Sequence, residues 1–309
     1  MCSASIVKRV FGEVELKFTQ PSRLHRDLEA LASSQKLHAS SLLIVDLAIN
    51  VDVAERFASA VRHLMQRGVK MVYVDHHPPP AGIEILGFAD EVIVNTRASC
   101  SELIYHLFAE GDGHSALLAA YGAIADSFDD TEFVKSQMLK WGKGILYFES
   151  EMLSLALLGM KAVELTSVAD ELARGLRVGR IDLVVTRAIR NLRLDYEVQR
   201  YVEENAVIEG PIALIEEVPQ RGFAGRAASY ALSLITGDVG IGIASRFNRE
   251  FVECSLRARG VDLTRFMPEI IREVGGSGGG HPYAYGVRVS AQKYKEFLEL
   301  LKLRAMTYA

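Results

Sequence analysis

Three acids and two histidines follow apolar or helical runs, and their types suit a metal centre. Asp75, His76 and His77 come directly after the run VKMVYV, Asp46 lies near the end of LLIVDLAI, and Asp126 ends GAIADSF. Carboxyl ends of parallel strands share one edge of a sheet, where open α/β proteins bind ligands. Carboxylate and imidazole groups bind Mn²⁺ or Zn²⁺, and such an ion polarises a phosphoryl group and acidifies a bound water. Helix caps, turn residues or a polar loop would explain the same residues without a metal.

Glycines gather between residues 275 and 286, in the stretch GGSGGGHPYAYG. Consecutive glycines permit close approach of a ligand to the backbone, and exposed N–H groups of such a loop can cradle an anion. Arginines in the nearby strand-like segment CSLRARG would add bidentate contacts to a phosphate. A flexible linker is the alternative, but a strand pattern follows directly, so we favour an anion site. The predicted substrate-binding residues are Gly278, Gly279, Gly280, His281, Arg257 and Arg259.

The elements that must position these residues alternate between strand and helix in the first half of the chain. The predicted strands are residues 14–19, 42–49, 69–74 and 91–94. The predicted helices are residues 22–31, 53–66, 99–108 and 114–125. Strands that alternate with crossover helices indicate a parallel sheet.

Helical spacing of Leu, Met and Ala continues from residue 133 to about residue 204, and a second α/β pattern follows. In that last part the predicted strands are residues 212–218, 239–245 and 251–257, and the predicted helices are residues 225–234, 264–273 and 291–304. We therefore predict an α/β fold with two domains. A parallel-sheet domain spans residues 1–205, with a helical part at 133–205, and a smaller α/β domain spans residues 206–309.

The composition is that of an ordinary globular protein, with 49% hydrophobic and 24% charged residues. There are 35 basic and 39 acidic residues, which give a net charge of −4, so any nucleic-acid contact should be local rather than spread over the surface. Three scattered cysteines exclude a disulfide scaffold and favour a reducing compartment. The chain has neither a long apolar run nor the apolar core of a signal peptide, so we expect a cytoplasmic protein without a membrane partner.

Taken together, the motifs resemble the DHH phosphoesterase superfamily with its C-terminal DHHA1 domain. Asp46, the Asp-His-His triplet at 75–77, Asp126 and the glycine cluster occur in the family's order over nearly the whole chain. The resemblance implies an enzyme that hydrolyses phosphodiesters or phosphomonoesters, usually with Mn²⁺ and with Mg²⁺ as the other candidate ion. The short two-domain form is similar to RecJ-like exonucleases and to the nanoRNase and pAp-phosphatase group.

The resemblance also implies a role for each residue of the site. Asp46 would bridge two metal ions, and His76 and Asp126 would complete the shell of one of them. Asp75 would orient a histidine or assist as a ligand, and His77 would touch the scissile phosphate and stabilise its developing charge. The glycine cluster would hold the terminal nucleotide or phosphate.

One part of the family pattern is missing from this sequence. The resemblance predicts a strand and a His-x-x-x-Asp-x-Asp-Gly motif before the first helix, but residues 1–9 already look like that helix. Either the true start lies upstream or the motif has been lost. We expect Asp46, His76 and Asp126 to hold one metal ion. A second ion would have few ligands, and we therefore expect the chain to be inactive or weakly active. Loss of a central strand would expose sheet edges and favour a homo-oligomer.

Three functions remain open. The leading one is a metal-dependent phosphodiesterase or exonuclease that acts on single-stranded DNA or RNA ends or on short oligonucleotides. The second is hydrolysis of a small nucleotide, such as 3′-phosphoadenosine 5′-phosphate (pAp) or a cyclic dinucleotide, and the net charge slightly favours such short substrates. The third is a non-catalytic RecJ-like scaffold in replication or repair, although a scaffold would not need the retained ligand residues.

Overall fold

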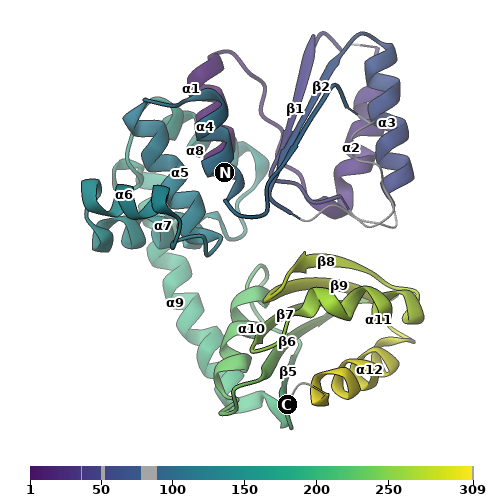
Figure 1. Cartoon of the computed structure of the whole chain (residues 1–309). Helices are drawn as coiled ribbons and strands as arrows, with labels where there is room; N and C mark the ends of the chain where they lie inside the picture. Colours follow the sequence, from purple (N-terminus) through teal and green to yellow (C-terminus); the bar gives the residue numbers. More distant parts are fainter. Residues whose placement is uncertain (36, 50–52, 78–88, 308–309) are drawn as a thin grey trace. The chain divides into compact units, whose positions relative to one another are not determined.

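The computed structural model describes residues 1–35, 37–49, 53–77 and 89–307, and the chain divides into two compact units (Figure 1). The first unit is Met1–Arg190 and the second is Asn191–Ala309. Each contains a β-sheet with helices packed on it, which confirms the predicted α/β fold. Among the described residues, no helix has the length and apolar character needed to span a bilayer.

The sheet of the first unit is parallel, and its strands end at a common edge. It consists of β1 (Ser41–Val45), β2 (Lys70–Asp75) and β3 (Glu91–Val94), hydrogen-bonded in that order. These strands form from apolar runs because a parallel sheet is buried on both faces. Val45 pairs with Val74, so the chain leaves β1 and β2 at neighbouring points.

Helices cover both faces of this sheet (Figure 1). On one side, α2 (Pro21–Ser33) and α3 (Ala54–Gln66) share an apolar core with the strands, to which Leu28, Phe57 and Met71 contribute. On the other side lie α1, α4 and α5, which span Cys2–Phe11, Cys100–Phe108 and Gly113–Ala125. The sheet is therefore enclosed as the sequence predicts.

An N-terminal cap fixes the start of α4, and close packing between Ser101 and Gly122 fixes α4 against α5. The Ser99 side chain accepts a hydrogen bond from the backbone N–H of Glu102 and caps α4. A Cβ atom at Gly122 would lie only 2.3 Å from Oγ of Ser101, so α4 and α5 pack closely at this point. A larger residue at this glycine would push the two helices apart.

Four helices follow in the region that the sequence predicts to be helical. They are α6 (Glu132–Trp141), α7 (Lys143–Leu157), α8 (Ala162–Ala173) and α9 (Asp182–Asn205). The predicted domain boundary, between residues 205 and 206, lies at the end of α9, whereas the division into compact units falls within that helix.

A buried ion pair explains why the last part of α9 belongs with the second unit. The carboxylate of Asp195, which is 2% exposed, accepts hydrogen bonds from Nε and Nη2 of Arg226 at 2.6 and 2.7 Å. The Tyr230 hydroxyl donates to the same carboxylate at 2.6 Å. Both partners come from α10 (Ala224–Ser233), so this contact fixes α9 to a helix of the second unit.

The second unit contains a mixed sheet of six strands in the order β4-β5-β6-β7-β9-β8. Its strands are β4 (Val207–Glu209), β5 (Ile212–Glu216), β6 (Gly240–Phe247), β7 (Phe251–Arg259), β8 (Ser277–His281) and β9 (Ala284–Ser290). Only β5 and β6 pair in parallel.

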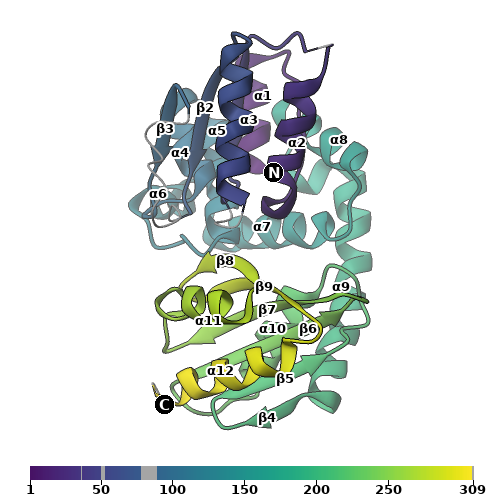
Figure 2. The same cartoon turned by 90° about the vertical axis from the view of Figure 1, so that its right-hand side faces the viewer.

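Helices lie on both faces of this second sheet. α10 crosses one face so closely that a Cβ atom at Gly242 would lie 2.0 Å from the Ala228 carbonyl oxygen. α11 (Met267–Val274) and α12 (Tyr294–Met306) pack with Leu256, Val287 and Phe297 in the apolar core of the other face, where α12 runs across the strands (Figure 2). The sheet is therefore the middle layer of this unit.

Two predicted elements are wrong. Residues 14–19 form no strand, because no neighbouring strand pairs with them and their side chains remain partly or fully exposed. Alternating apolar residues give a strand only when a sheet edge is available to pair with them. The predicted helix at 264–273 is split into a 3₁₀ turn, Leu263–Arg265, and α11, which begins just before a proline.

Candidate metal centre

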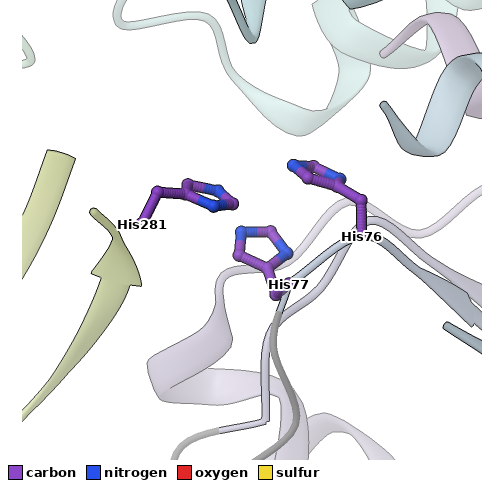
Figure 3. Close-up of side chains that lie close together, drawn as sticks. All are labelled: His76, His77 and His281. Carbon is purple, nitrogen blue, oxygen red and sulfur yellow. The ribbon is translucent and has the colours of Figure 1, made fainter. Parts of the chain in front are cut away.

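Asp46 stands where the chain leaves β1. Its backbone N–H donates to the Val74 carbonyl oxygen at 3.1 Å, and its φ angle of 59° is left-handed. A residue other than glycine seldom adopts this conformation, and such strain is found most often at functional sites. The turn holds Asp46 next to the end of β2, from which His76 and His77 follow (Figure 3).

The side chains of these residues form one group. Possible metal-ligand atoms of Asp46, Asp75, His76 and His77 all lie within 4.8 Å of one another. His76 is 3% exposed, and its Nδ1 lies 3.3 Å from Oδ1 of Asp46. The structure therefore brings these four residues together at one edge of the sheet.

The imidazole of His76 is held from three sides. Its Nδ1 accepts the backbone N–H of Cys100 at 3.2 Å, at the start of α4. The Phe128 ring stands edge-on to it, with the ring centroids 5.5 Å apart. Burial lowers the pKa of His76, but the neighbouring Asp46 carboxylate raises it more, so the pKa lies above its ordinary value. Burial raises the pKa of Asp46, but the hydrogen bond to His76 and the positive charges nearby together lower it more, so it lies below its ordinary value.

Asp75 is fully buried, and hydrogen bonds within the protein occupy both of its oxygens. Oδ1 accepts the backbone N–H of His76 and the Nδ1–H of His77, each at 2.8 Å. Oδ2 lies 2.8 Å from the Tyr73 hydroxyl. These contacts favour an orienting role for Asp75 over a role as a metal ligand, because a ligand needs a free oxygen lone pair aimed at the ion.

Asp126 follows the last residue of α5, and Ser127 after it has a left-handed φ angle of 63°. Asp126 is not one of the four clustered residues, and its side chain reaches the surface of the unit. Its charge still interacts with the group. The pKa of Asp126 is raised to about 6, because the surrounding protein disfavours its ionisation and because the negative charge of Asp46 opposes it.

This set of donors fits a divalent cation. Two carboxylates that repel each other, Asp46 and Asp126, lie near the ring nitrogens of His76 and His77. A cation would remove the repulsion that raises the pKa of Asp126, and Mn²⁺ accepts both carboxylate and imidazole ligands. Asp46, His76 and Asp126 are the residues that would hold such an ion.

The glycine cluster, which lies in the second unit, is not the open loop that we expected. Residues 277–281 form β8, which pairs along its length with β9. Cβ atoms at Gly278 and Gly280 would lie 2.5 and 2.3 Å from the carbonyl oxygens of Gly286 and Ala284, so glycine is needed for close strand pairing. β8 is an edge strand, and on one of its sides no strand of the described sheet pairs with it.

The two predicted arginines of β7 differ in their surroundings. Arg257 donates to the Leu256 carbonyl oxygen, and its Nη2 lies 2.8 Å from the place where a Cβ atom of Gly225 would be, at the start of α10. Burial lowers its pKa, and among the described residues no carboxylate pairs with it. Arg259 instead donates to the carbonyl oxygens of Ile235 and Gly237 at 2.6 and 2.7 Å, which closes the turn after α10.

Tyr73, Phe128 and Ser127 also lie at this site, and none of them was predicted from the sequence. Tyr73 stands two residues before Asp75 on the same strand, and residues so spaced share one face of a strand, so this spacing could have indicated the contact. Nothing in the sequence indicates the position of Phe128, because it depends on the left-handed turn at Ser127.

Comparisons with known proteins support the fold described above. The DHHA1 domain family matches residues 213–306. A DHH-domain structure, described as a member of a family of ribosomal proteins, is 17% identical, with a TM-score of 0.63 over 86% of this chain and 69% of that one. RecJ from Thermus thermophilus, in complex with Mn²⁺, is 16% identical, with a TM-score of 0.62 over all of this chain and 50% of its own length.

A third similar structure is a pGpG-specific phosphodiesterase from Vibrio cholerae. It is 12% identical, with a TM-score of 0.53 over all of this chain and 96% of that one. No curated protein matches the sequence. The chain thus spans about half the length of the Thermus RecJ and nearly all of the phosphodiesterase, and at these identities the likenesses establish the fold.

Proposed function

We propose that the chain is a member of the DHH/DHHA1 phosphoesterase superfamily and, on that premise, a metal-dependent phosphodiesterase that acts on single-stranded ends or short oligonucleotides. The observation that carries the proposal is the cluster of Asp46, His76 and His77, with Asp75 buried behind the histidines. A polar cluster of this kind at the carboxyl ends of parallel strands is a typical site for reaction chemistry.

The residues of this cluster would have different roles in hydrolysis. A bound divalent ion would polarise the phosphoryl group and acidify a water, and Asp46, His76 and Asp126 would hold that ion. Asp75 accepts the Nδ1–H of His77, so the Nε2 of His77 remains for the substrate. In the doubly protonated form of His77, the Nε2–H donates to a phosphoryl oxygen and stabilises its negative charge.

The second unit supplies the proposed site for the substrate's terminal phosphate. Arg257 is half-buried at the start of α10 without a carboxylate partner among the described residues, and a helix N-terminus itself attracts anions. An anionic group at this place would satisfy the guanidinium. The open side of β8, with Gly279 and His281, would lie against the rest of the nucleotide.

A small-nucleotide substrate is the second candidate. A pGpG-specific phosphodiesterase is among the similar structures, with a TM-score of 0.53. The net charge of −4 also favours a short substrate over a long polyanion.

Hydrolysis assays with Mn²⁺ test both candidates. The substrates are a short single-stranded DNA, the matching RNA, pGpG and pAp, each offered to the wild type, Asp46→Asn and Asp129→Asn. Asp129 is the control because it accepts a hydrogen bond from the Tyr147 hydroxyl and is not one of the clustered residues. We expect stepwise shortening of the oligonucleotides by the wild type and the control and none by Asp46→Asn. Cleavage of pGpG or pAp alone would favour the small-nucleotide function. If no substrate is cleaved and Mn²⁺ does not bind, the proposal fails and the non-catalytic scaffold takes its place.

A further inference from the structure

Tyr73 joins the two strand ends that carry the metal-centre residues. Its hydroxyl lies 2.8 Å from Oδ2 of Asp75 and 2.9 Å from the carbonyl oxygen of Leu47, the residue after Asp46. The side chain is 3% exposed, and its ring packs edge-on against Phe57 of α3. Packing in the core therefore fixes the ring of Tyr73. Its hydroxyl lies near the ends of both strands, close to Leu47 after β1 and to Asp75 at the end of β2.

The hydroxyl has one proton and two acceptors. Burial and the nearby Asp75 both raise the pKa of Tyr73, so the phenol stays neutral and keeps its proton as a donor. A carboxylate is a stronger acceptor than a backbone carbonyl, so Asp75 takes this hydrogen bond more often than Leu47 does. The other carboxylate oxygen of Asp75, Oδ1, accepts hydrogen bonds from the backbone N–H of His76 and the Nδ1–H of His77.

Without this hydroxyl, Oδ2 of Asp75 would lose the side-chain donor that it has among the described residues. An unsatisfied buried oxygen costs enough free energy to favour rotation of the carboxylate. Rotation would move Oδ1, which accepts the Nδ1–H of His77. The imidazole would lose the partner that fixes its tautomer and its orientation.

We infer that Tyr73 is a positioning residue that holds Asp75 and, through it, sets the tautomer and direction of His77. Its consequence for hydrolysis rests on the proposed function. Its consequence for His77 does not, because the contacts among Tyr73, Asp75 and His77 are present in the protein alone.

Tyr73→Phe tests this inference, because it removes the hydroxyl and keeps the ring against Phe57. Tyr230→Phe is the matched control, since Tyr230 also donates to a buried aspartate, but in the second unit. The first readout is the ¹⁵N spectrum of the His77 imidazole in protein labelled at histidine. We expect wild type and control to show His77 protonated at Nδ1, and Tyr73→Phe to show a shift towards averaged tautomers.

The second readout is the rate of hydrolysis under saturating Mn²⁺. We expect kcat to fall by about tenfold to hundredfold in Tyr73→Phe, as for other residues that orient catalytic groups, with KM unchanged. In an Asp75→Asn background the same substitution should have no further effect on kcat, because the two residues act in one chain of contacts.

Unchanged ¹⁵N shifts of His77 in a folded Tyr73→Phe would overturn the inference. An equal loss of kcat from Tyr73→Phe in the wild-type and Asp75→Asn backgrounds would also overturn it, because the hydroxyl would then act independently of Asp75. If the wild type hydrolyses nothing, the proposed function fails, and the His77 spectra still decide the role of Tyr73.

Discussion

Asp75 and His25 are both buried polar residues of the first unit, and their surroundings differ completely. Each oxygen of Asp75 has a donor, whereas neither ring nitrogen of His25 has a hydrogen-bond partner among the described residues, although His25 is only 3% exposed. A satisfied buried group fixes geometry, and an unsatisfied one reduces stability. The first residue therefore belongs to the site, and the second is a weak point of α2.

The pKa of His25 gives a prediction for stability. Burial lowers this pKa from 6.5, and Arg56 lowers it further, while Glu29 acts in the opposite direction. Asp27 on the same helix also raises it, and Arg26 lowers it. The unfolded chain takes up a proton near pH 6.5 and the folded chain does not. The contribution of the neutral His25 to the free energy of unfolding is thus fully present above pH 6.5. It decreases as the pH falls towards the lowered pKa of the folded protein.

We expect His25→Leu to raise the free energy of unfolding by roughly 1–3 kcal/mol at pH 5, because it removes two unpaired nitrogens and the protonation cost. The gain should be smaller at pH 8. Urea unfolding at both values measures it, with the exposed His38→Leu as a control. A gain that does not depend on pH would show that His25 titrates in the folded protein as it does in the unfolded chain.

At the scale of the element, β8 shows what a glycine run does in this protein. Its glycines alternate between positions that touch β9 and a position that faces open space. A Cβ atom at Gly280 would lie 2.3 Å from the Ala284 carbonyl oxygen, whereas one at Gly279 would meet nothing within 4 Å. The pattern thus supports strand pairing at two glycines and leaves the third open.

Two alanine substitutions test this account of β8. We expect Gly280→Ala to lower the free energy of unfolding by about 1–3 kcal/mol, because backbone must move to admit the methyl group. Its neighbour Gly279→Ala should change stability by less than about 0.5 kcal/mol. Chemical unfolding of the two variants gives the comparison. Equal losses would mean that β8 does not pair with β9 in this register.

The sequence predicted most elements because hydrophobic spacing determines them locally. The strand at 91–94 and the helix at 99–108, which Ser99 caps, lie where they were predicted, within one residue at each end. The predicted strand at residues 14–19 was wrong, because a strand needs a neighbouring strand to pair with and hydrophobic spacing does not reveal one. The prediction of an open loop at residues 277–281 was wrong, because a run of glycines has no hydrophobic pattern. The pairing of β8 with β9 depends instead on the close approach of two backbones.

At the scale of the whole molecule, α9 is the helix in which the two units divide. Its end is bound to α10 by the buried Asp195, which pairs with Arg226 and Tyr230. The predicted boundary at residue 205 was placed where the helical spacing ends, and that spacing does not show which unit the last part of a long helix packs against. Acids and histidines of the candidate site could be singled out from the sequence because most of them follow apolar strands directly, whereas Tyr73 lies within a strand and has no chemical signature of its own.

Breaking this ion pair should destabilise the second unit. We expect Arg226→Leu to lower its free energy of unfolding by roughly 2–4 kcal/mol, since Asp195 would be left buried with the Tyr230 hydroxyl as its remaining donor. The exposed pair of Arg288 and Glu253 offers the control, and Arg288→Leu should cost less than about 1 kcal/mol. Thermal unfolding of both variants measures the difference. Similar losses would contradict the assignment of α9 to this unit.

The claim that Asp46, His76 and Asp126 form a metal centre is tested most directly by calorimetric titration of the protein with Mn²⁺. Wild type, Asp46→Asn and the control Asp129→Asn are compared at the same pH. The account predicts that wild type and control bind Mn²⁺ and that Asp46→Asn loses this binding. Unchanged binding in Asp46→Asn, or no binding by the wild type, would contradict the metal centre and the hydrolytic function that depends on it.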